Sequence, residues 1–209
     1  MSKIVEKLVS AQLTAYLESN NLMPRLQSAN RRHHSTETAL LRVMSDLLSA
    51  ADSQRVTLLG LLDLSAAFDC VDHDILLHRL QKAFGIHGSA LKWIRSFLVD
   101  RSQQVSYDGQ LSADGHLACG VPQGSVLGPL LFLLYMAELF DLIAERGLTA
   151  HSYADDTQVY ISAPAIDAAS VTLRFTTCVE HIKAWMSSNR LKLNTDEASH
   201  VDGNSTAAG

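Results

Sequence analysis

The sequence of 209 residues contains little cysteine, few aromatic side chains and no excess of positive charge. Its three cysteines, Cys70, Cys119 and Cys178, are odd in number and far apart, which excludes a disulfide framework and the paired spacing of a zinc site. We therefore expect a reduced, intracellular protein. Lysine and arginine total 17 against 22 aspartates and glutamates, so the chain lacks the basic stripe of a stand-alone nucleic-acid-binding domain.

Long hydrophobic runs are also absent. The most apolar segment, 130–137, is too short to span a bilayer, and the amphipathic N-terminus lacks the continuous apolar stretch of a signal peptide. We therefore expect no membrane segment, and no targeting signal narrows the compartment further. The sequence does contain 47% apolar and only 19% charged residues, which is typical of one globular domain with a sizeable core.

Apolar spacing and turn signals predict a mixture of helices and strands. Helices are expected over 3–17, after a cap at Ser35 or Thr36, and over 72–84, 90–99, 130–146 and 168–188. The helix after Ser35 is expected to bury Leu40, Val43, Met44, Leu47 and Leu48. The apolar run 56–62 is typical of a strand buried on both faces. Hairpin turns are expected at Asp108–Gly109 and at the paired aspartates of 151–162.

Asp63 directly follows the strand over 56–62. A carboxylate at the end of a buried strand is costly unless it is paired or binds a metal. The same side chain would also suit a cap for the next turn, so its position alone leaves both interpretations open.

Asp155 and Asp156 are adjacent within an apolar hairpin. Because successive strand residues point to opposite faces, their carboxylates converge only if a tight turn redirects one of them. Aspartate is common in turns, so an ordinary turn is the alternative. Together with Asp63, the pair suggests a site for two Mg²⁺ ions, which prefer oxygen ligands and can clamp both reacting oxygens of a phosphoryl transfer.

Three segments resemble, in order, motifs A, B and C of reverse transcriptases: LLDLSAAFDCVDHDILL at 61–77, GVPQGSVLGPLLFLLYM at 120–136 and YADDTQVYIS at 153–162. The flanking segments QSANRRHHSTETALLRV and WMSSNRLKLN are similar to those of LINE-type (non-LTR) retrotransposons. The resemblance covers about 3–194. It implies a truncated reverse transcriptase domain of the α+β class. Its polymerase palm would be a small antiparallel sheet backed by helices, with partial fingers and no thumb.

The resemblance assigns roles to individual residues. Asp63, Asp155 and Asp156 would be the catalytic ligands of two Mg²⁺ ions, with Mn²⁺ as a possible substitute. Phe68 would reject a ribose 2′-OH by steric exclusion. The other nucleotide-binding residues would be Leu64, Ser65, Gln123 and Gly124, and the primer end would be supported by Tyr153 and Ala154.

The implied domain extends over 1–194, with helical fingers at 3–55 and the palm at 56–194, followed by a disordered polar tail at 195–209. The implied activity is RNA-directed DNA synthesis, by two-metal nucleotidyl transfer from a dNTP to the 3′-OH of a DNA primer on an RNA template. No membrane partner is expected.

The sequence departs from the family pattern in segments that hold substrate. An arginine-bearing RPIS-like segment would precede the first helix, Glu197 stands where motif D carries a lysine, and the thumb and endonuclease are missing. We therefore expect little or no polymerase activity from the isolated chain, which would be a partial or decayed retrotransposon copy or a gene-model fragment. The missing segments would also explain the acidic net charge.

Several alternatives compete with this interpretation. The chain could be a non-catalytic relic or a weak nucleic-acid-binding module. A template-dependent RNA polymerase is disfavoured because Phe68 would block a 2′-OH. A serine hydrolase is least favoured because Ser125 lacks the G-x-S-x-G order of a nucleophile elbow.

Other polar side chains are interpreted as structural. Asp69, Asp72 and Asp74 would be caps or solvated charges. Arg31 and Arg32 suit a solvated loop at least as well as contacts to template phosphates.

Overall fold

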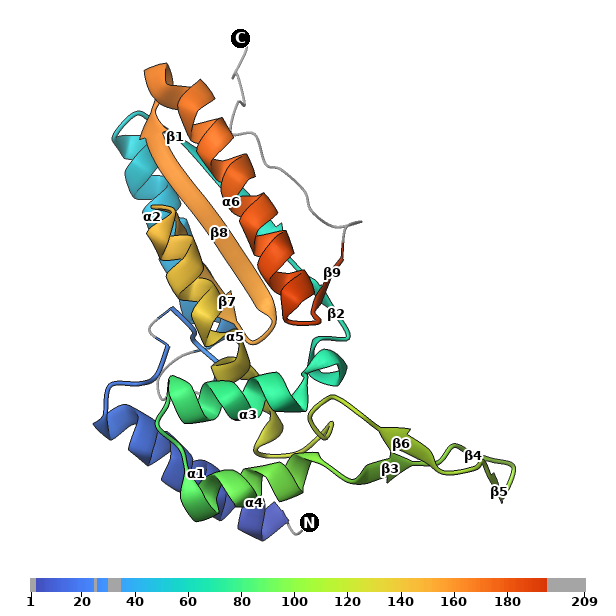
Figure 1. Ribbon diagram of the computed structural model, residues 1–209. Coiled ribbons are helices and arrows are strands. Elements are labelled where there is room, and N and C mark those ends of the chain that lie inside the picture. Colours follow the sequence, from blue (N-terminus) through green and yellow to red (C-terminus); the bar gives the residue numbers. More distant parts are fainter. Residues whose placement is uncertain (1–2, 25, 30–34, 195–209) are drawn as a thin grey trace. The chain divides into compact units, whose positions relative to one another are not determined.

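The computed structural model describes residues 3–24, 26–29 and 35–194, and Figure 1 shows its elements along the chain. The chain forms two compact units. Unit 1 contains 1–23 and 66–135, and unit 2 contains 24–65 and 136–209. The expected polar tail at 195–209, Glu197, Arg31 and Arg32 lie outside the described residues.

The described part of the chain contains six α-helices: α1 (Lys3–Ser19), α2 (Thr36–Asp52), α3 (His73–Lys82), α4 (Gly88–Leu98), α5 (Gly128–Glu145) and α6 (Ala168–Ser188). Two short 3₁₀ helices cover Ala67–Cys70 and Ala165–Asp167. The strands are β1 (Arg55–Leu62), β2 (Leu64–Ser65), β3 (Arg101–Gln103), β4 (Ser106–Tyr107), β5 (Gln110–Leu111), β6 (Gly115–Leu117), β7 (Thr149–Tyr153), β8 (Asp156–Pro164) and β9 (Lys192–Leu193). The predicted α+β class is confirmed.

Unit 2 is built on an antiparallel sheet with the strand order β1-β8-β7. Tyr160 of β8 donates a hydrogen bond to Asp46, which sets α2 against the face of the sheet that carries Tyr160. Gly60 of β1 belongs to the opposite face, where a Cβ would stand 2.9 Å from the Phe175 ring of α6. The two helices therefore cover opposite faces, as Figure 1 shows with α6 in front of β8 and α2 behind it.

Two expectations about burial in unit 2 are wrong. The strand over 56–62 is not buried on both faces: β1 is an edge strand, most of its side chains are only half-buried, and Leu61 is 42% exposed. On α2, Val43 is buried as expected, but Leu47 is only half-buried, and Leu40, Met44 and Leu48 are exposed. Ala39, Val43 and Ala50 instead form its buried side, because the leucines occupy more of the helix circumference than one sheet face can cover.

Unit 1 contains α1, α3 and α4 together with two small hairpins. The hydroxyl of Tyr16 on α1 donates to the carbonyl of Phe84, which follows α3. The predicted hairpin turn is confirmed: Asp108 and Gly109 both have positive φ, 48° and 74°, and connect β4 to β5.

Helix caps follow the sequence closely. The Ser35 hydroxyl accepts a hydrogen bond from the Thr38 backbone N–H, and the Thr38 hydroxyl accepts one from the Ser35 N–H, which makes a reciprocal capping box for α2. Asp72 accepts from the N–H groups of Asp74 and Ile75 and caps α3. None of the helices in the described ranges is long and apolar enough to cross a membrane.

Candidate functional site

The predicted carboxylates gather at one end of the unit 2 sheet. The antiparallel pairing of β1 and β8 runs from Arg55↔Pro164 to Leu62↔Thr157. Continuing this register by one residue sets Asp63 opposite Asp156. Opposed residues of an antiparallel pair have Cβ atoms roughly 5 Å apart, close enough for strong interaction between like charges.

Asp155 enters the site through the turn between β7 and β8. Tyr153 pairs with Asp156, so the two-residue loop consists of Ala154 and Asp155, one position earlier than the predicted turn at the two aspartates. Ala154 has a φ of 58°, in the left-handed region that residues with a Cβ rarely adopt. Adjacent residues of a strand would point to opposite faces, but Asp155 lies in the loop while Asp156 begins the strand, so the turn can bring the two carboxylates to the same side.

The carboxylates interact electrostatically. Loss of hydration raises the pKa of Asp156 above its ordinary value, and the negative charges of Asp155 and then Asp63 raise it further. The repulsion shows that three acids from two distant segments share one region of unit 2. Such a region favours a cation.

Asp63 is held in place by the segment that follows α6. The Asn194 backbone N–H donates to the Asp63 carbonyl at 2.9 Å, and the Asn194 side-chain amide donates to the Asp63 carboxylate at 3.2 Å. Strand β2 pairs with β9 alongside, so that Leu64 opposes Leu193 and Ser65 opposes Lys192. Leu64 is buried and Ser65 half-buried. Sequence reasoning missed Asn194, although the WMSSNRLKLN segment that ends with it was a usable signal.

Tyr153 and Ala154, the predicted primer-end residues, lie at the tip of the same hairpin and are half-buried. The side chain of Gln27 contacts the main chain of Ala154 through two hydrogen bonds. Sequence reasoning also missed a role for Gln27, although this residue begins the QSANRRHHSTETALLRV segment that is similar to LINE-type retrotransposons.

Phe68, Gln123 and Gly124 lie in unit 1. The Phe68 ring is 4.7 Å from the Phe132 ring, and the Phe68 carbonyl accepts from the Val121 N–H. The Gln123 amide donates to both carboxylate oxygens of Asp69, at 3.2 and 3.1 Å. Motifs A and B therefore meet within this unit.

Gly124 and the acids that follow motif A complete the description of this region. Gly124 has a φ of +69°, and a Cβ there would meet only open space. Asp69 is exposed, as a solvated charge should be, yet it also has Gln123 as a partner. Asp72 is the expected cap, and Asp74 is exposed, with one oxygen 4.0 Å from Arg95.

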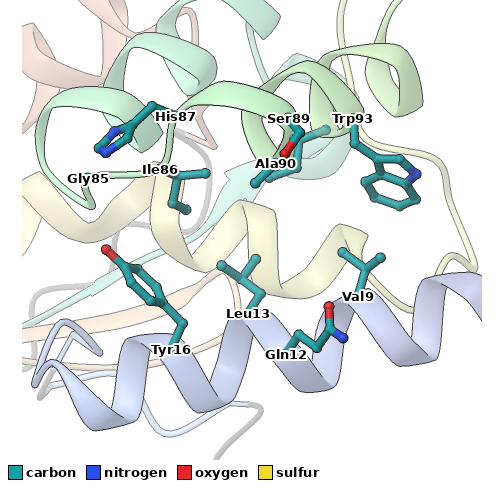
Figure 2. A pocket seen from close by; sticks show the side chains of 11 residues that line it. Val9, Gln12, Leu13, Tyr16, Gly85, Ile86, His87, Ser89, Ala90 and Trp93 are labelled. Atoms are coloured by element: carbon teal, nitrogen blue, oxygen red, sulfur yellow. The ribbon is translucent and has the colours of Figure 1, made fainter.

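A separate apolar groove of about 570 Å³ lies between α1 and α4 in unit 1. Figure 2 shows Val9, Leu13 and Tyr16 on one side and Ile86, Ala90 and Trp93 on the other. The groove is lined by no acidic residue, so it offers no carboxylate to a divalent cation.

Comparisons with known proteins agree with these features. The family model described as reverse transcriptase (RNA-dependent DNA polymerase) matches residues 1–201. The RNA-directed DNA polymerase from mobile element jockey of Drosophila melanogaster is 29% identical over 206 residues, which are 96% of this chain and 22% of that protein. The probable RNA-directed DNA polymerase from transposon BS of the same species is 30% identical over 201 residues, 93% of this chain and 22% of that protein. The chain thus spans 22% of the length of these relatives.

Two solved structures share the fold. Apo telomerase from Candida tropicalis, truncated from its C-terminal domain, matches with a TM-score of 0.67 at 16% identity, over 98% of this chain and 41% of that one. Telomerase from Candida albicans, in complex with the TWJ fragment of telomeric RNA, matches with a TM-score of 0.66 at 14% identity, over 97% of this chain and 34% of that one. At these identities the likeness concerns the fold alone.

Proposed function

The chain belongs to the reverse transcriptase family, with the retrotransposon enzymes of jockey and BS among its relatives, and we propose that it is the palm-bearing fragment of an RNA-directed DNA polymerase. The observation that carries the proposal is the β1–β8 register, which sets Asp63 opposite Asp156 beside the turn that holds Asp155. In this proposal the palm comprises 56–194, and the segment 3–55 belongs to the fingers.

The three acids fit a Mg²⁺ site that substrate completes. Within residues 3–24, 26–29 and 35–194, no group of three histidine, cysteine, aspartate or glutamate side chains forms a ready set of metal ligands. Mg²⁺, however, is usually held by one or two carboxylates together with waters and substrate phosphates. Burial raises the pKa of Asp156 most, and the repulsion by Asp155 and Asp63, which raises it further, is relieved by a divalent cation. Asp63, Asp155 and Asp156 would hold two Mg²⁺ ions, or Mn²⁺ in their place.

When bound, the two ions would neutralise charge on the attacking and leaving oxygens of an in-line phosphoryl displacement. The protein contributes position. Asn194 orients the Asp63 carboxylate, and the β7–β8 turn fixes Asp155 relative to Asp156. In phosphoryl transfer such positioning, with charge stabilisation, supplies most of the catalysis.

We propose that the other predicted residues bind substrate. Phe68, whose ring is fixed against Phe132, would exclude the ribose 2′-OH and so select dNTPs. Gly124, with open space where a Cβ would stand, would admit the incoming nucleotide and the template beside Gln123. The backbone N–H of Leu64 or Ser65 would contact the triphosphate. Tyr153 and Ala154 would support the 3′ end of a DNA primer paired to an RNA template.

The net charge of −5 favours a second candidate, a non-catalytic relic that binds nucleic acid weakly. Primer extension on poly(rA)/oligo(dT) with Mg²⁺ separates the two. We expect little or no dTTP incorporation from the isolated chain. Robust incorporation that disappears in Asp155→Ala would overturn the expectation of inactivity and support the site.

Metal binding tests the site without requiring turnover. A ligand that binds only the folded chain raises its Tm. We expect Mn²⁺ to raise the Tm of the full chain, and this rise to be lost in Asp63→Ala and in Asp156→Ala alike, because the ion is shared. Asp167→Ala is the matched control, since Asp167 is an exposed acid of the same unit whose side chain makes no capping hydrogen bond at the start of α6. Equal stabilisation in all three variants would contradict the shared site.

A further inference from the structure

Gln27 lies far from the carboxylates in sequence but touches the turn that carries them. Its side chain is 1% exposed, and it belongs to the short segment before α2. We propose that Gln27 is a positioning residue that fixes the Ala154–Asp155 turn and thereby the spacing of the metal-binding carboxylates. The inference rests on the function proposed above and adds to that site a residue from a third segment of the chain.

The Gln27 side-chain amide uses both of its N–H groups and both acceptor positions of its oxygen. Its Nε2 donates to the Ala154 carbonyl at 3.0 Å, and its Oε1 accepts from the Ala154 N–H at 3.1 Å. The side chain therefore pairs with both main-chain groups of one residue, as a neighbouring strand would. The same Nε2 also donates to the Ser152 hydroxyl at 3.2 Å, and Oε1 also accepts from the Ala29 N–H at 3.0 Å.

The backbone around Gln27 is itself anchored to the hairpin. Gln27 forms a parallel bridge with Ser152, in which the Ser152 N–H donates to Leu26 and the Ser28 N–H donates to Ser152, both at 2.9 Å. The Ser28 hydroxyl lies 3.0 Å from Nε2 of His151. The main chain of Gln27 is thus fixed against β7, so its side-chain amide can hold the Ala154–Asp155 turn in a defined position.

The turn needs an external support for two reasons. Ala154 has positive φ, which its Cβ disfavours, and Asp155 in the loop is directly followed by Asp156 at the start of β8, so two acidic residues are adjacent. The support extends to the strand as well. The Ser152 hydroxyl, which accepts from Gln27, donates to the Asp156 carbonyl at 2.9 Å. Gln27 is therefore linked to the main chain on both sides of Asp155.

The test compares Mn²⁺ affinity of the full chain across three variants. Gln27→Met keeps the length of the side chain but removes all of its side-chain hydrogen bonds. Gln27→Asn keeps the amide but is one methylene too short to reach both groups of Ala154, and it decides the test if Gln27→Met does not fold. Thr57→Val is the control, because it removes a side-chain hydrogen bond to Ser162 at the far end of the same sheet.

We expect both Gln27 variants to bind Mn²⁺ about tenfold more weakly than the wild-type chain, in line with other residues that support metal ligands from behind. The amide hydrogen of Ala154 should also exchange faster in both. Thr57→Val should lower the Tm but leave Mn²⁺ affinity unchanged. If the role of Gln27 were merely structural, its variants would show the same pattern, a lower Tm with unchanged Mn²⁺ affinity.

Two contrary results are distinguishable. If Asp155→Ala abolishes Mn²⁺ binding while the Gln27 variants bind as the wild type does, Gln27 is not a positioning residue and the site itself stands. If the wild-type chain and Asp155→Ala bind Mn²⁺ equally, the carboxylate site fails and the inference fails with it.

Discussion

Two hairpins of this protein reverse direction over two residues, and they do so by different means. The β4–β5 turn uses Asp108 and Gly109, residue types that accept positive φ, and both its strands are exposed. The β7–β8 turn uses Ala154 and Asp155, and its Ala154 is held by the buried amide of Gln27. The β4–β5 turn has residue types that accept positive φ and needs no buried side chain to hold it. The β7–β8 turn has residues suited to the carboxylate site, and a side chain from another segment stabilises it.

The largest difference between the turns should be in metal response. Each turn carries one aspartate, so Asp155→Ala and Asp108→Ala are matched substitutions. We expect Asp155→Ala to abolish the stabilisation by Mn²⁺, which would amount to about 2.7 kcal/mol at a concentration 100 times Kd. Asp108→Ala should retain all of it. Thermal melts with and without Mn²⁺ measure both, and loss in the Asp108 variant would break the comparison.

The next effect concerns external support without metal. Gln27→Met leaves both main-chain groups of Ala154 without the Gln27 amide, and we expect a loss of about 2 kcal/mol in the free energy of unfolding. Its counterpart in the other hairpin is Ser112→Ala, which removes an exposed acceptor for the Val105 N–H and should cost less than about 0.5 kcal/mol. Urea denaturation gives both values. Similar losses would show that both hairpins rely on side-chain support equally.

A reciprocal exchange of residues tests the backbone itself. Gly109→Ala introduces a Cβ at a φ of 74° and should destabilise by about 1 kcal/mol. Ala154→Gly removes the same conflict and should be neutral or stabilise by less than about 1 kcal/mol, because glycine loses more entropy on folding. The free energy of unfolding should therefore fall in Gly109→Ala but not in Ala154→Gly, and a similar fall in both variants would contradict the strain at Ala154.

The smallest effect concerns pH. The pKa of Asp156 is raised in the folded chain, so the folded state holds this proton more tightly than the unfolded state. Stability should therefore fall as pH rises from the ordinary aspartate pKa through the raised one. Asp156→Asn should raise the Tm slightly at neutral pH, with no gain at a pH where both states are protonated. The gain is small because solvent screens an exposed carboxyl, and an Asp156→Asn variant that is less stable at neutral pH would contradict the repulsion.

Local features of this fold are readable from its sequence. The caps at Ser35 and Asp72 and the turn at Asp108–Gly109 follow from side chains that satisfy nearby backbone groups, so a few residues determine each. Burial is harder to predict from the sequence. An apolar run does not reveal that β1 lies at a sheet edge, and the pattern of leucines in α2 does not reveal which of them face the sheet.

The candidate site also has one part that the sequence predicts and one that it does not. Its acids are visible as motifs, and their register follows from a hairpin and one strand. Their supports are not visible, because Gln27 and Ala154 are 127 residues apart and Asn194 and Asp63 are 131 apart. No local periodicity encodes a contact over such separations.

The hydrogen bond between Asn194 and Asp63 can form only late in the synthesis of the chain, so the site is completed late as well. Chains are made from the N-terminus, and segments fold as they emerge. Strand β1 and the hairpin acids are therefore synthesised well before the asparagine that orients the first of them. A nascent chain halted before β9 would already possess every acid of the site, with Asp63 still free to turn away.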